Sequence, residues 1–396
     1  MARIFYFSHP SRIASSYEKL YHVSSTRSFW MGAELARLGH EVAAPVYGTW
    51  PPAKEPPHGM KFVPFADIPQ LGEFDLIFCH LVGPSYRLLL DCAFAGKYER
   101  RAIDPKVALK LASYVNELPV FLQSDHPLSR VHRDDQLDEF GKSRVRAVGL
   151  SAPNATCEID CPSFYCPPSV VPDRPDAPPP PDPYAASRRA GRPVVVYLGR
   201  LNDNCRPSMS QRLNEIACAT PEADFYIISG KVRGGSVQKI IVVHDDDENR
   251  DVHQGRVTLI SDLFTASNVT FLPTPSYDRT FRYLMHADLG VALSVRVGQD
   301  IASCKMWEYV SCGLPAVCDD QLPEAFLCQT YGLSNPFPFG NARAAADAIR
   351  RALHGGVNRA DLIRRMRREH SYHERAERWS RVFQDAGFSR RGGLHA

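Results

Sequence analysis

The sequence predicts an α/β protein made of two doubly wound, Rossmann-like domains. Short apolar runs typical of buried parallel strands alternate with helical patterns along both halves of the chain. A stretch at 167–193, in which ten of 27 residues are proline, separates the two halves. The length of 396 residues suits two or three domains, and 44% hydrophobic with 23% charged residues is an ordinary globular composition.

The first half begins with a predicted strand at 3–7 and a helix at 28–38. Gly39 follows that helix, where a glycine commonly ends one, and a second strand is expected at 41–44. These elements form a βαβ unit. Further strands of the same short apolar kind are expected at 75–80, 119–123 and 145–150. The pattern favours a mostly parallel sheet with helices on both faces.

The second half repeats the scheme. Strands are expected at 193–198, 225–228, 269–272, 289–293 and 315–318, with helices at 277–286 and 305–311. Proline fixes φ and has no N–H to donate, so 167–193 is predicted to be an extended connector rather than a helix interior or central strand. The expected organisation is a first domain at 1–166, the connector, a second domain at 194–358 and C-terminal helices at 359–396.

Positive charge is concentrated near the C-terminus. The chain has a net charge of +3, but 13 arginines against 6 acidic residues give 343–391 a net +7 and leave −4 for the remainder. This predicts contact with an anionic partner, either a lipid surface or nucleic acid; a solvated helical face is the alternative. No apolar run approaches a membrane span and no signal peptide pattern is present, so a cytoplasmic protein, with peripheral membrane contact as an option, is expected.

The segment 298–318 carries the most informative chemistry. Ser303 lies near an expected helix start, where free N–H groups and the helix dipole favour a phosphate. Lys305 adds a positive charge for a diphosphate, and Glu308 follows on the same helical face, where a carboxylate can accept hydrogen bonds from ribose hydroxyls. The alternative is an amphipathic helix with a capping serine and a surface Lys/Glu pair.

The same segment resembles the donor motif of GT-B glycosyltransferases, in which two α/β domains face each other across a cleft. Asp300-x7-Glu308 keeps the spacing of their Glu-x7-Glu motif, with Asp as the first acid. Ser303, Lys305, Tyr309 and the run 313–318 are similar to xanthan-type β-glucuronosyltransferases. The resemblance implies a nucleotide-sugar donor, with a UDP-sugar favoured and a GDP-sugar second, no obligatory metal or cofactor, and C-terminal helices that return to the first domain.

A second part of the donor site is expected after the strand that ends at Leu198. Gly199-Arg200-Leu201 resembles the Gly-Arg-Leu loop of the same superfamily, and an arginine there would neutralise diphosphate charge without a metal. Family members often carry a lysine five residues after that arginine. This chain has Cys205 there and Arg206 beside it, so Arg206 is the candidate for the second cation.

The first domain is expected to supply the acceptor side. Asp125 follows the strand at 119–123, between Ser124 and His126, and a carboxylate at that edge is a candidate general base. An Asx turn is the alternative. The stretch resembles the Ser-Asp of the glucuronosyltransferases, which implies inversion. It is also similar to the His-Asp-His of T-even phage DNA α-glucosyltransferases, which together with Asp300-x7-Glu308 implies retention.

Three further residues end strands of the first domain. Ser8 and His9 follow the first strand, and His80 ends the strand at 75–80. They are candidates for contact with the acceptor, against the alternative of ordinary loop residues. The sequence therefore predicts sugar transfer from a nucleotide-diphosphate sugar to a hydroxyl of a glycan, a glycolipid or a modified DNA base. A non-enzymatic nucleotide-sugar sensor or partner subunit is the remaining alternative, and no metal ligands are assigned.

Overall fold

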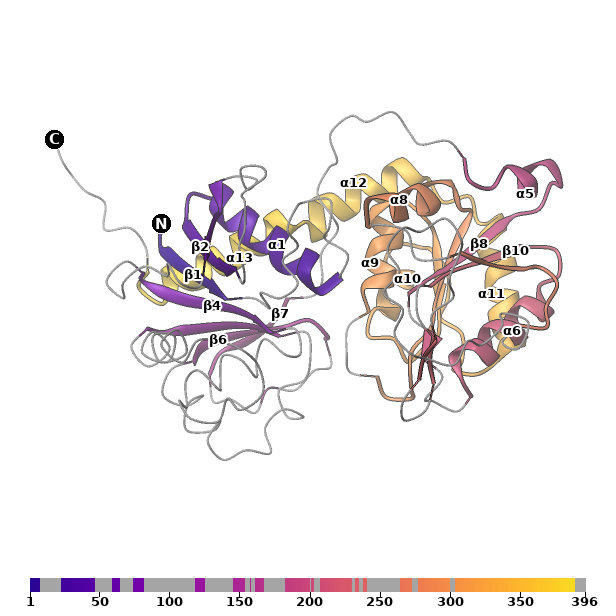
Figure 1. Cartoon of the computed structure of the whole chain (residues 1–396), viewed down its shortest axis with the longest axis horizontal. Coiled ribbons are helices and arrows are strands. Elements are labelled where there is room, and N and C mark those ends of the chain that lie inside the picture. The colour runs from indigo at the N-terminus through magenta and orange to yellow at the C-terminus, as the bar shows by residue number, and fades with distance from the viewer. Residues whose placement is uncertain are drawn as a thin grey trace. The chain divides into compact units, whose positions relative to one another are not determined.

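The structure, a computed structural model, divides into two compact units. Unit 1 comprises Met1–Pro172, Asp300–Ala302 and Arg368–Ala396, and unit 2 comprises Asp173–Gln299 and Ser303–Arg367. Each unit is a sheet with helices packed on it (Figure 1). The residues that the structure describes are 1–7, 23–46, 59–64, 74–81, 118–124, 145–153, 157, 161–166, 182–199, 201–202, 207–229, 232–234, 238–240, 264–272, 277–299 and 303–388.

Unit 1 contains a seven-stranded sheet in the order β3-β2-β1-β4-β5-β6-β7, and every neighbouring pair is parallel. The strands are β1 (Arg3–Phe7), β2 (Glu41–Val46), β3 (Lys61–Pro64), β4 (Leu76–Leu81), β5 (Val120–Ser124), β6 (Val145–Leu150) and β7 (Ser163–Tyr165). The order reverses between β1 and β4. In doubly wound sheets a crevice forms at such a switch point, outside the carboxyl ends of the strands.

Two helices cover one face of this sheet, α1 (Val23–Arg37) and the C-terminal α13 (Tyr372–Asp385). The Ser371 side chain caps α13 by accepting a hydrogen bond from the Glu374 N–H at 3.1 Å. Trp379 then packs on Phe78 of β4, with ring centroids 4.7 Å apart, and its indole N–H donates to Gln123 Oε1 at 3.1 Å. The last helix of the chain is thus part of the core of the first unit.

Unit 2 contains a five-stranded parallel sheet in the order β13-β10-β8-β14-β15. Its strands are β8 (Val194–Leu198), β10 (Asp224–Ile228), β13 (Val269–Leu272), β14 (Leu289–Ala292) and β15 (Ala316–Cys318). The switch point lies between β8 and β14. A small sheet of β12 (Gln238–Ile240), β11 (Val232–Gly234) and β9 (Leu201–Asn202) adjoins the chain just after β8.

Helices α6 (Met209–Ala219) and α11 (Ala342–His354) bury apolar faces against one side of this sheet. Each begins at a capping side chain: Ser208 accepts from the Gln211 N–H and Asn341 from the Ala344 N–H. The other helices that the structure describes here are α5 (Ala185–Arg189), α8 (Tyr277–His286), α9 (Cys304–Ser311), α10 (Ala325–Thr330) and α12 (Arg359–His370). Among the helices described in both units, none has the length and apolar character needed to cross a bilayer.

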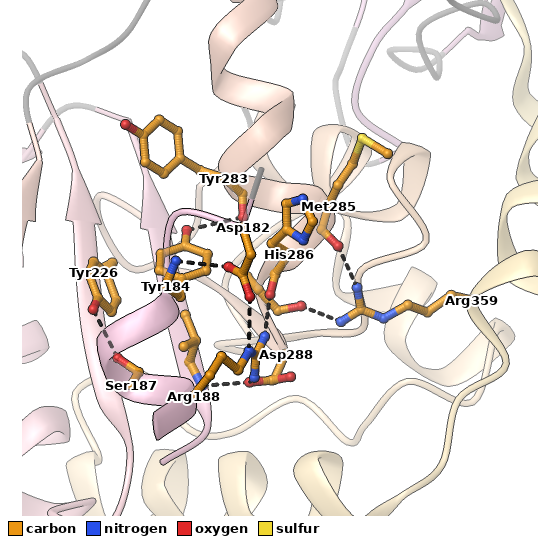
Figure 2. Close-up of polar contacts among 12 residues, drawn as sticks. Asp182, Tyr184, Ser187, Arg188, Tyr226, Tyr283, Met285, His286, Asp288 and Arg359 are labelled. Carbon is orange, nitrogen blue, oxygen red and sulfur yellow. Dashed lines mark hydrogen bonds and ion pairs between the residues drawn. The ribbon is translucent and has the colours of Figure 1, made fainter. Parts of the chain in front are cut away.

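A polar cluster ties α5 to the amino end of this sheet (Figure 2). Arg188 donates to Asp288 at 2.6 Å, and the same Asp288 oxygen accepts the N–H of Val194, the first residue of β8, at 2.7 Å. Arg188 also lies 3.5 Å from Asp182 and donates to the His286 carbonyl. These contacts lie at the amino end of the sheet, opposite the carboxyl ends of its strands.

The predicted fold class is confirmed, since both halves form parallel α/β sheets. The predicted strands 3–7, 145–150 and 269–272 and the helix 277–286 have the observed bounds. The proline-rich connector differs in its second half, because Ala185–Arg189 forms α5. The reason is local: between Pro183 and Pro193 there is no proline, so the backbone is free to form a helical turn.

Candidate functional site

The switch point of unit 2 lies between β8 and β14, and Gly199 and Ser294 follow these strands at their carboxyl ends, where doubly wound sheets bind ligands. Helix α9 connects β14 to β15, and its first turn is the helix start that the sequence predicted. Four of the seven predicted donor residues are described by the structure, and all belong to this unit: Gly199, Ser303, Lys305 and Glu308. Arg200, Arg206 and Asp300 lie outside the described residues.

Tyr309 fixes α9 on the sheet. Its hydroxyl donates to the Val291 carbonyl at 3.0 Å and accepts the Leu198 N–H at 2.9 Å. The hydroxyl therefore replaces a ladder hydrogen bond between β8 and β14 where the two strands end. Gly290 makes room for the ring, because a Cβ there would lie 2.6 Å from Tyr309 Cδ2. Burial holds the pKa of Tyr309 well above its ordinary range, so the phenol keeps the proton that it donates.

Lys305 crosses the backbone of Gly199. A Cβ on Gly199 would lie 2.8 Å from Lys305 Cε, and Gly199 has a φ of +116°, which L side chains rarely adopt. The Lys305 Nζ lies 5.4 Å from the centroid of the Tyr197 ring, a cation–π distance. Glycine is thus required at this position for two independent reasons, and the close approach of Lys305 places that side chain at the carboxyl end of β8.

Ser303 is the N-cap of α9 and is buried. Its hydroxyl accepts from the Lys305 N–H at a long 3.4 Å, and its own N–H donates to Glu324 Oε1 at 2.6 Å. Free N–H groups in the first turn of a helix and the dipole behind them attract anions. The start of α9 and the ammonium of Lys305 therefore add positive potential to the same edge of the sheet.

Burial lowers the pKa of Lys305, and the carboxylates of Glu308, Glu324 and Asp319 oppose that shift. Glu308 is 8% exposed and lies one turn after the lysine on α9. A partly buried cation among several carboxylates at a switch point marks this edge of the sheet as a candidate functional site.

A buried ion pair lies at the same edge and was not predicted from the sequence. Arg212 of α6 and Asp319, which follows β15, are 3.3 Å apart with side chains 3% and 0% exposed. Arg212 also donates to the Ser294 carbonyl, and its guanidinium lies 4.4 Å from the centre of the Phe339 ring. Asp319 could have been found from the sequence, because it directly follows the expected strand at 315–318, just as Asp125 follows the strand at 119–123.

The acceptor-side candidates belong to unit 1, and few of them are described. His80 is buried in β4, and parallel pairing places it beside Gln123 of β5. Ser124 is the last residue of β5 and pairs with Leu81. The side-chain amide of Gln123 donates to Ser151 Oγ and the Cys166 carbonyl, which gives it a structural role. Ser8, His9, Asp125 and His126 lie outside the described residues.

No protein-family model matches the chain, and no curated protein matches it. Solved structures do match over almost its full length. HepE from Anabaena in complex with UDP gives a TM-score of 0.60 at 12% identity, covering 97% of this chain and 100% of that one. The fold is GT-B.

Two other solved structures agree with this fold. AviGT4, a glycosyltransferase involved in avilamycin A biosynthesis, has a TM-score of 0.57 at 14% identity, with 98% of each chain covered. Sucrose-phosphate synthase from Thermosynechococcus elongatus has a TM-score of 0.55 at 14% identity, covering 97% of this chain and 99% of that one. At these identities the similarity establishes the GT-B fold alone. The finer resemblance to xanthan-type and phage enzymes stays a prediction.

Proposed function

We propose that the protein is a glycosyltransferase that moves a sugar from a nucleotide-diphosphate donor to an acceptor hydroxyl. The observation that carries this proposal is the passage of Lys305 over Gly199 at the β8/β14 switch point, beside the start of α9. It provides a cation and a helix N-terminus where ligands bind in doubly wound sheets. HepE, which shares the fold, was solved with UDP and with UDP-glucose, which supports a UDP-sugar as the first donor to test; a GDP-sugar is the second.

On this proposal each donor residue has a distinct role. The ammonium of Lys305 and the guanidinium of Arg200 neutralise the diphosphate, so the leaving group departs without an obligatory metal. Glu308 accepts hydrogen bonds from the ribose hydroxyls. Asp300, the first acid of the Asp300-x7-Glu308 pair, contacts the donor sugar, and Arg206 supplies the second cation in place of the family lysine. Because Lys305 is partly buried in the folded protein, part of the cost of removing water from its charge is already met before the diphosphate binds.

The transfer step uses Asp125 as the general base. The acceptor oxygen attacks the anomeric carbon, its proton passes to the Asp125 carboxylate, and the bond from that carbon to the diphosphate breaks as the nucleoside diphosphate leaves. Ser8, His9, His80, Ser124 and His126 are the proposed acceptor contacts. This route inverts the anomeric centre; a product that retains it would instead assign the chemistry to the donor-side acids.

The first experiment is a thermal-shift panel of UDP-, GDP-, ADP-, CMP- and dTDP-sugars. A donor at about 100 times its dissociation constant stabilises the native state by about 2.7 kcal/mol. We expect a shift with the UDP-sugars, followed by turnover that Asp125→Asn abolishes while donor affinity is kept. Asp385→Asn, at an exposed position on α13, is the matched control. Donor binding in which Asp125→Asn leaves every reaction unchanged would identify a sensor instead.

The acceptor is a hydroxyl of a glycan or glycolipid, with a modified DNA base as the second candidate. The exposed arginines of α12 and α13 favour an anionic partner: Arg364, Arg367, Arg368, Arg378 and Arg381. Binding to duplex DNA that falls steeply with salt would support the DNA acceptor. Binding to vesicles containing anionic lipid, with no affinity for DNA, would support a glycolipid acceptor at a membrane surface.

A further inference from the structure

The loop between β14 and α9 is held by side chains from one short segment of the chain. This loop runs from Ser294 to Ser303, and the segment that holds it follows β15. Asp319 Oδ2 accepts the Ser294 N–H at 2.9 Å, and Gln321 Oε1 accepts the Gly298 N–H at 2.9 Å. Glu324 Oε1 accepts the Ser303 N–H at 2.6 Å. Three acceptors thus bind the beginning, the middle and the end of one loop.

The segment itself is fixed. Asp319 is fully buried and pairs with Arg212, which also donates to the Ser294 carbonyl, so both backbone groups of Ser294 are bonded. The Gln321 N–H donates to Asp319 Oδ1 at 3.2 Å, which links the first two acceptors. Glu324 is buried. Backbone groups that are already held by fixed acceptors lose less conformational entropy when a ligand binds.

One residue of the loop has a left-handed backbone conformation, which glycine adopts without strain. Gly298 has a φ of +65°, with open space around the position of a Cβ. Within the loop, the Val295 N–H donates to Gln299 Oε1 at 2.6 Å. The turn is therefore specified by a glycine conformation and by side-chain acceptors.

We propose that Asp319, Gln321 and Glu324 are positioning residues that hold the backbone at Ser294, Gly298 and Ser303 in place before the donor arrives. This inference rests on the proposed function for its effect on donor binding, since the loop carries Asp300 and ends at the cap of α9. Their contribution is to preorganisation, so loosening the loop weakens donor binding while the complex, once formed, reacts at the same rate.

The test uses Gln321, because its side chain is only partly buried and its replacement spares the Arg212–Asp319 pair. Gln321→Ala removes the acceptor, whereas Gln321→Glu keeps an acceptor oxygen for the Gly298 N–H but loses the amide that donates to Asp320 Oδ1 at 2.9 Å, so it should restore part of the wild-type behaviour. Gln329→Ala, an exposed glutamine of α10, is the matched control. Hydrogen exchange of a peptide covering 294–303 is measured on the full chain without ligand, and donor KM and kcat are measured with a UDP-sugar.

We expect Gln321→Ala to speed exchange in that peptide and to raise donor KM, each by about two- to tenfold, the range for one hydrogen bond, with kcat within about twofold. Unchanged exchange would overturn the proposal, and so would faster exchange with an unchanged KM. If the wild-type chain binds no nucleotide sugar, the proposed function fails on its own, and the exchange comparison still decides whether Gln321 holds the loop.

Discussion

The two ends of the unit 2 sheet use charge in opposite ways. At the amino end, Arg188 and Asp288 are 2.6 Å apart with side chains 37% and 30% exposed, and both also bond backbone groups (Figure 2). Partial burial lowers the pKa of Arg188, but the hydrogen bond and charge of Asp288 outweigh it and leave that pKa above its ordinary value. At the carboxyl end, burial outweighs the neighbouring carboxylates and lowers the pKa of Lys305.

The opposite pKa shifts of Arg188 and Lys305 distinguish a charge that stabilises the fold from a charge that is available for ligand binding. A raised arginine pKa means that the folded state favours the charged form, so the amino-end pair adds to stability. A lowered lysine pKa means that the folded state disfavours the charged form, so Lys305 reduces stability at neutral pH. Proteins retain such groups where function requires them.

The largest effect is expected for Lys305→Met. Loss of the ammonium should weaken donor binding by about 100-fold, near the upper range for a hydrogen bond to a charged group. The melting temperature should stay the same or rise, because methionine avoids the desolvation of a charge. Calorimetric titration with a UDP-sugar and a thermal melt measure the two quantities. Lys61→Met, at an exposed position of β3 in unit 1, is the control. A variant that binds donor normally but melts earlier would assign Lys305 to structure.

Gly199→Ala should be next in size. The φ of +116° and the 2.8 Å approach to Lys305 together should lower stability by about 2 kcal/mol and weaken donor binding. Gly191, at the amino end, has a φ of +67° and open space around it, so Gly191→Ala should lower stability by only about 1 kcal/mol. Denaturant unfolding of both variants measures the difference.

A double variant identifies the source of that difference. Gly199→Ala is expected to lose more stability than Gly191→Ala. If this additional loss arises from contact between the new Cβ and Lys305, the double variant Gly199→Ala with Lys305→Ala should regain it, and only the loss from backbone strain should remain. If the additional loss of stability persists in the double variant, it does not arise from contact with Lys305.

The strands could be predicted because parallel sheets buried on both faces leave continuous apolar runs, as in β8 and β14. The edge strands β3 and β7 were not predicted. Each has only three or four residues, and β3 contains a proline, which an edge position tolerates. The short helix α5 was not predicted, because the prolines that precede it favoured an extended connector over the whole stretch.

The part of the candidate site that could be predicted consists of residues from one short segment of the sequence. Ser303, Lys305 and Glu308 are close in sequence, so helical spacing alone placed them together. Arg212 and Asp319 are 107 residues apart, and only the fold brings them into contact. Arg212 also lies among the buried apolar residues of α6, where periodicity gives no sign of a charge. Long-range pairing of this kind leaves no local pattern.

A smaller effect is expected at the amino end. Arg188→Ala should lower stability by about 1 kcal/mol, since a partly exposed ion pair contributes little and the backbone contact adds some. Donor affinity should not change. Arg343→Ala, at an exposed position of α11, is the control for loss of an arginine. A drop in donor affinity for Arg188→Ala, measured by titration, would contradict the assignment of stabilising charges to the amino end and donor-binding charges to the carboxyl end of the sheet.

The most gradual effect is the pH dependence of Lys305. Between its lowered folded pKa and about 10.5, the folded chain binds fewer protons at this lysine than the unfolded chain does. Stability therefore rises with pH through that window, by at most about 1.4 kcal/mol per pH unit. The advantage of Lys305→Met over wild type, measured by denaturant unfolding at a series of pH values, should shrink as the pH approaches 10.5.

Donor binding should change in the opposite direction over the same window. As the pH rises through the lowered pKa, Lys305 loses the charge that the diphosphate needs, so wild-type donor affinity falls while stability rises. Lys305→Met should lack this titration in both measurements. A stabilising ion pair such as Arg188–Asp288 cannot give opposite signs, because its charged form is the one that the fold prefers. Stability and donor affinity that fall together with rising pH would therefore show that Lys305 stabilises the fold, as the amino-end charges do.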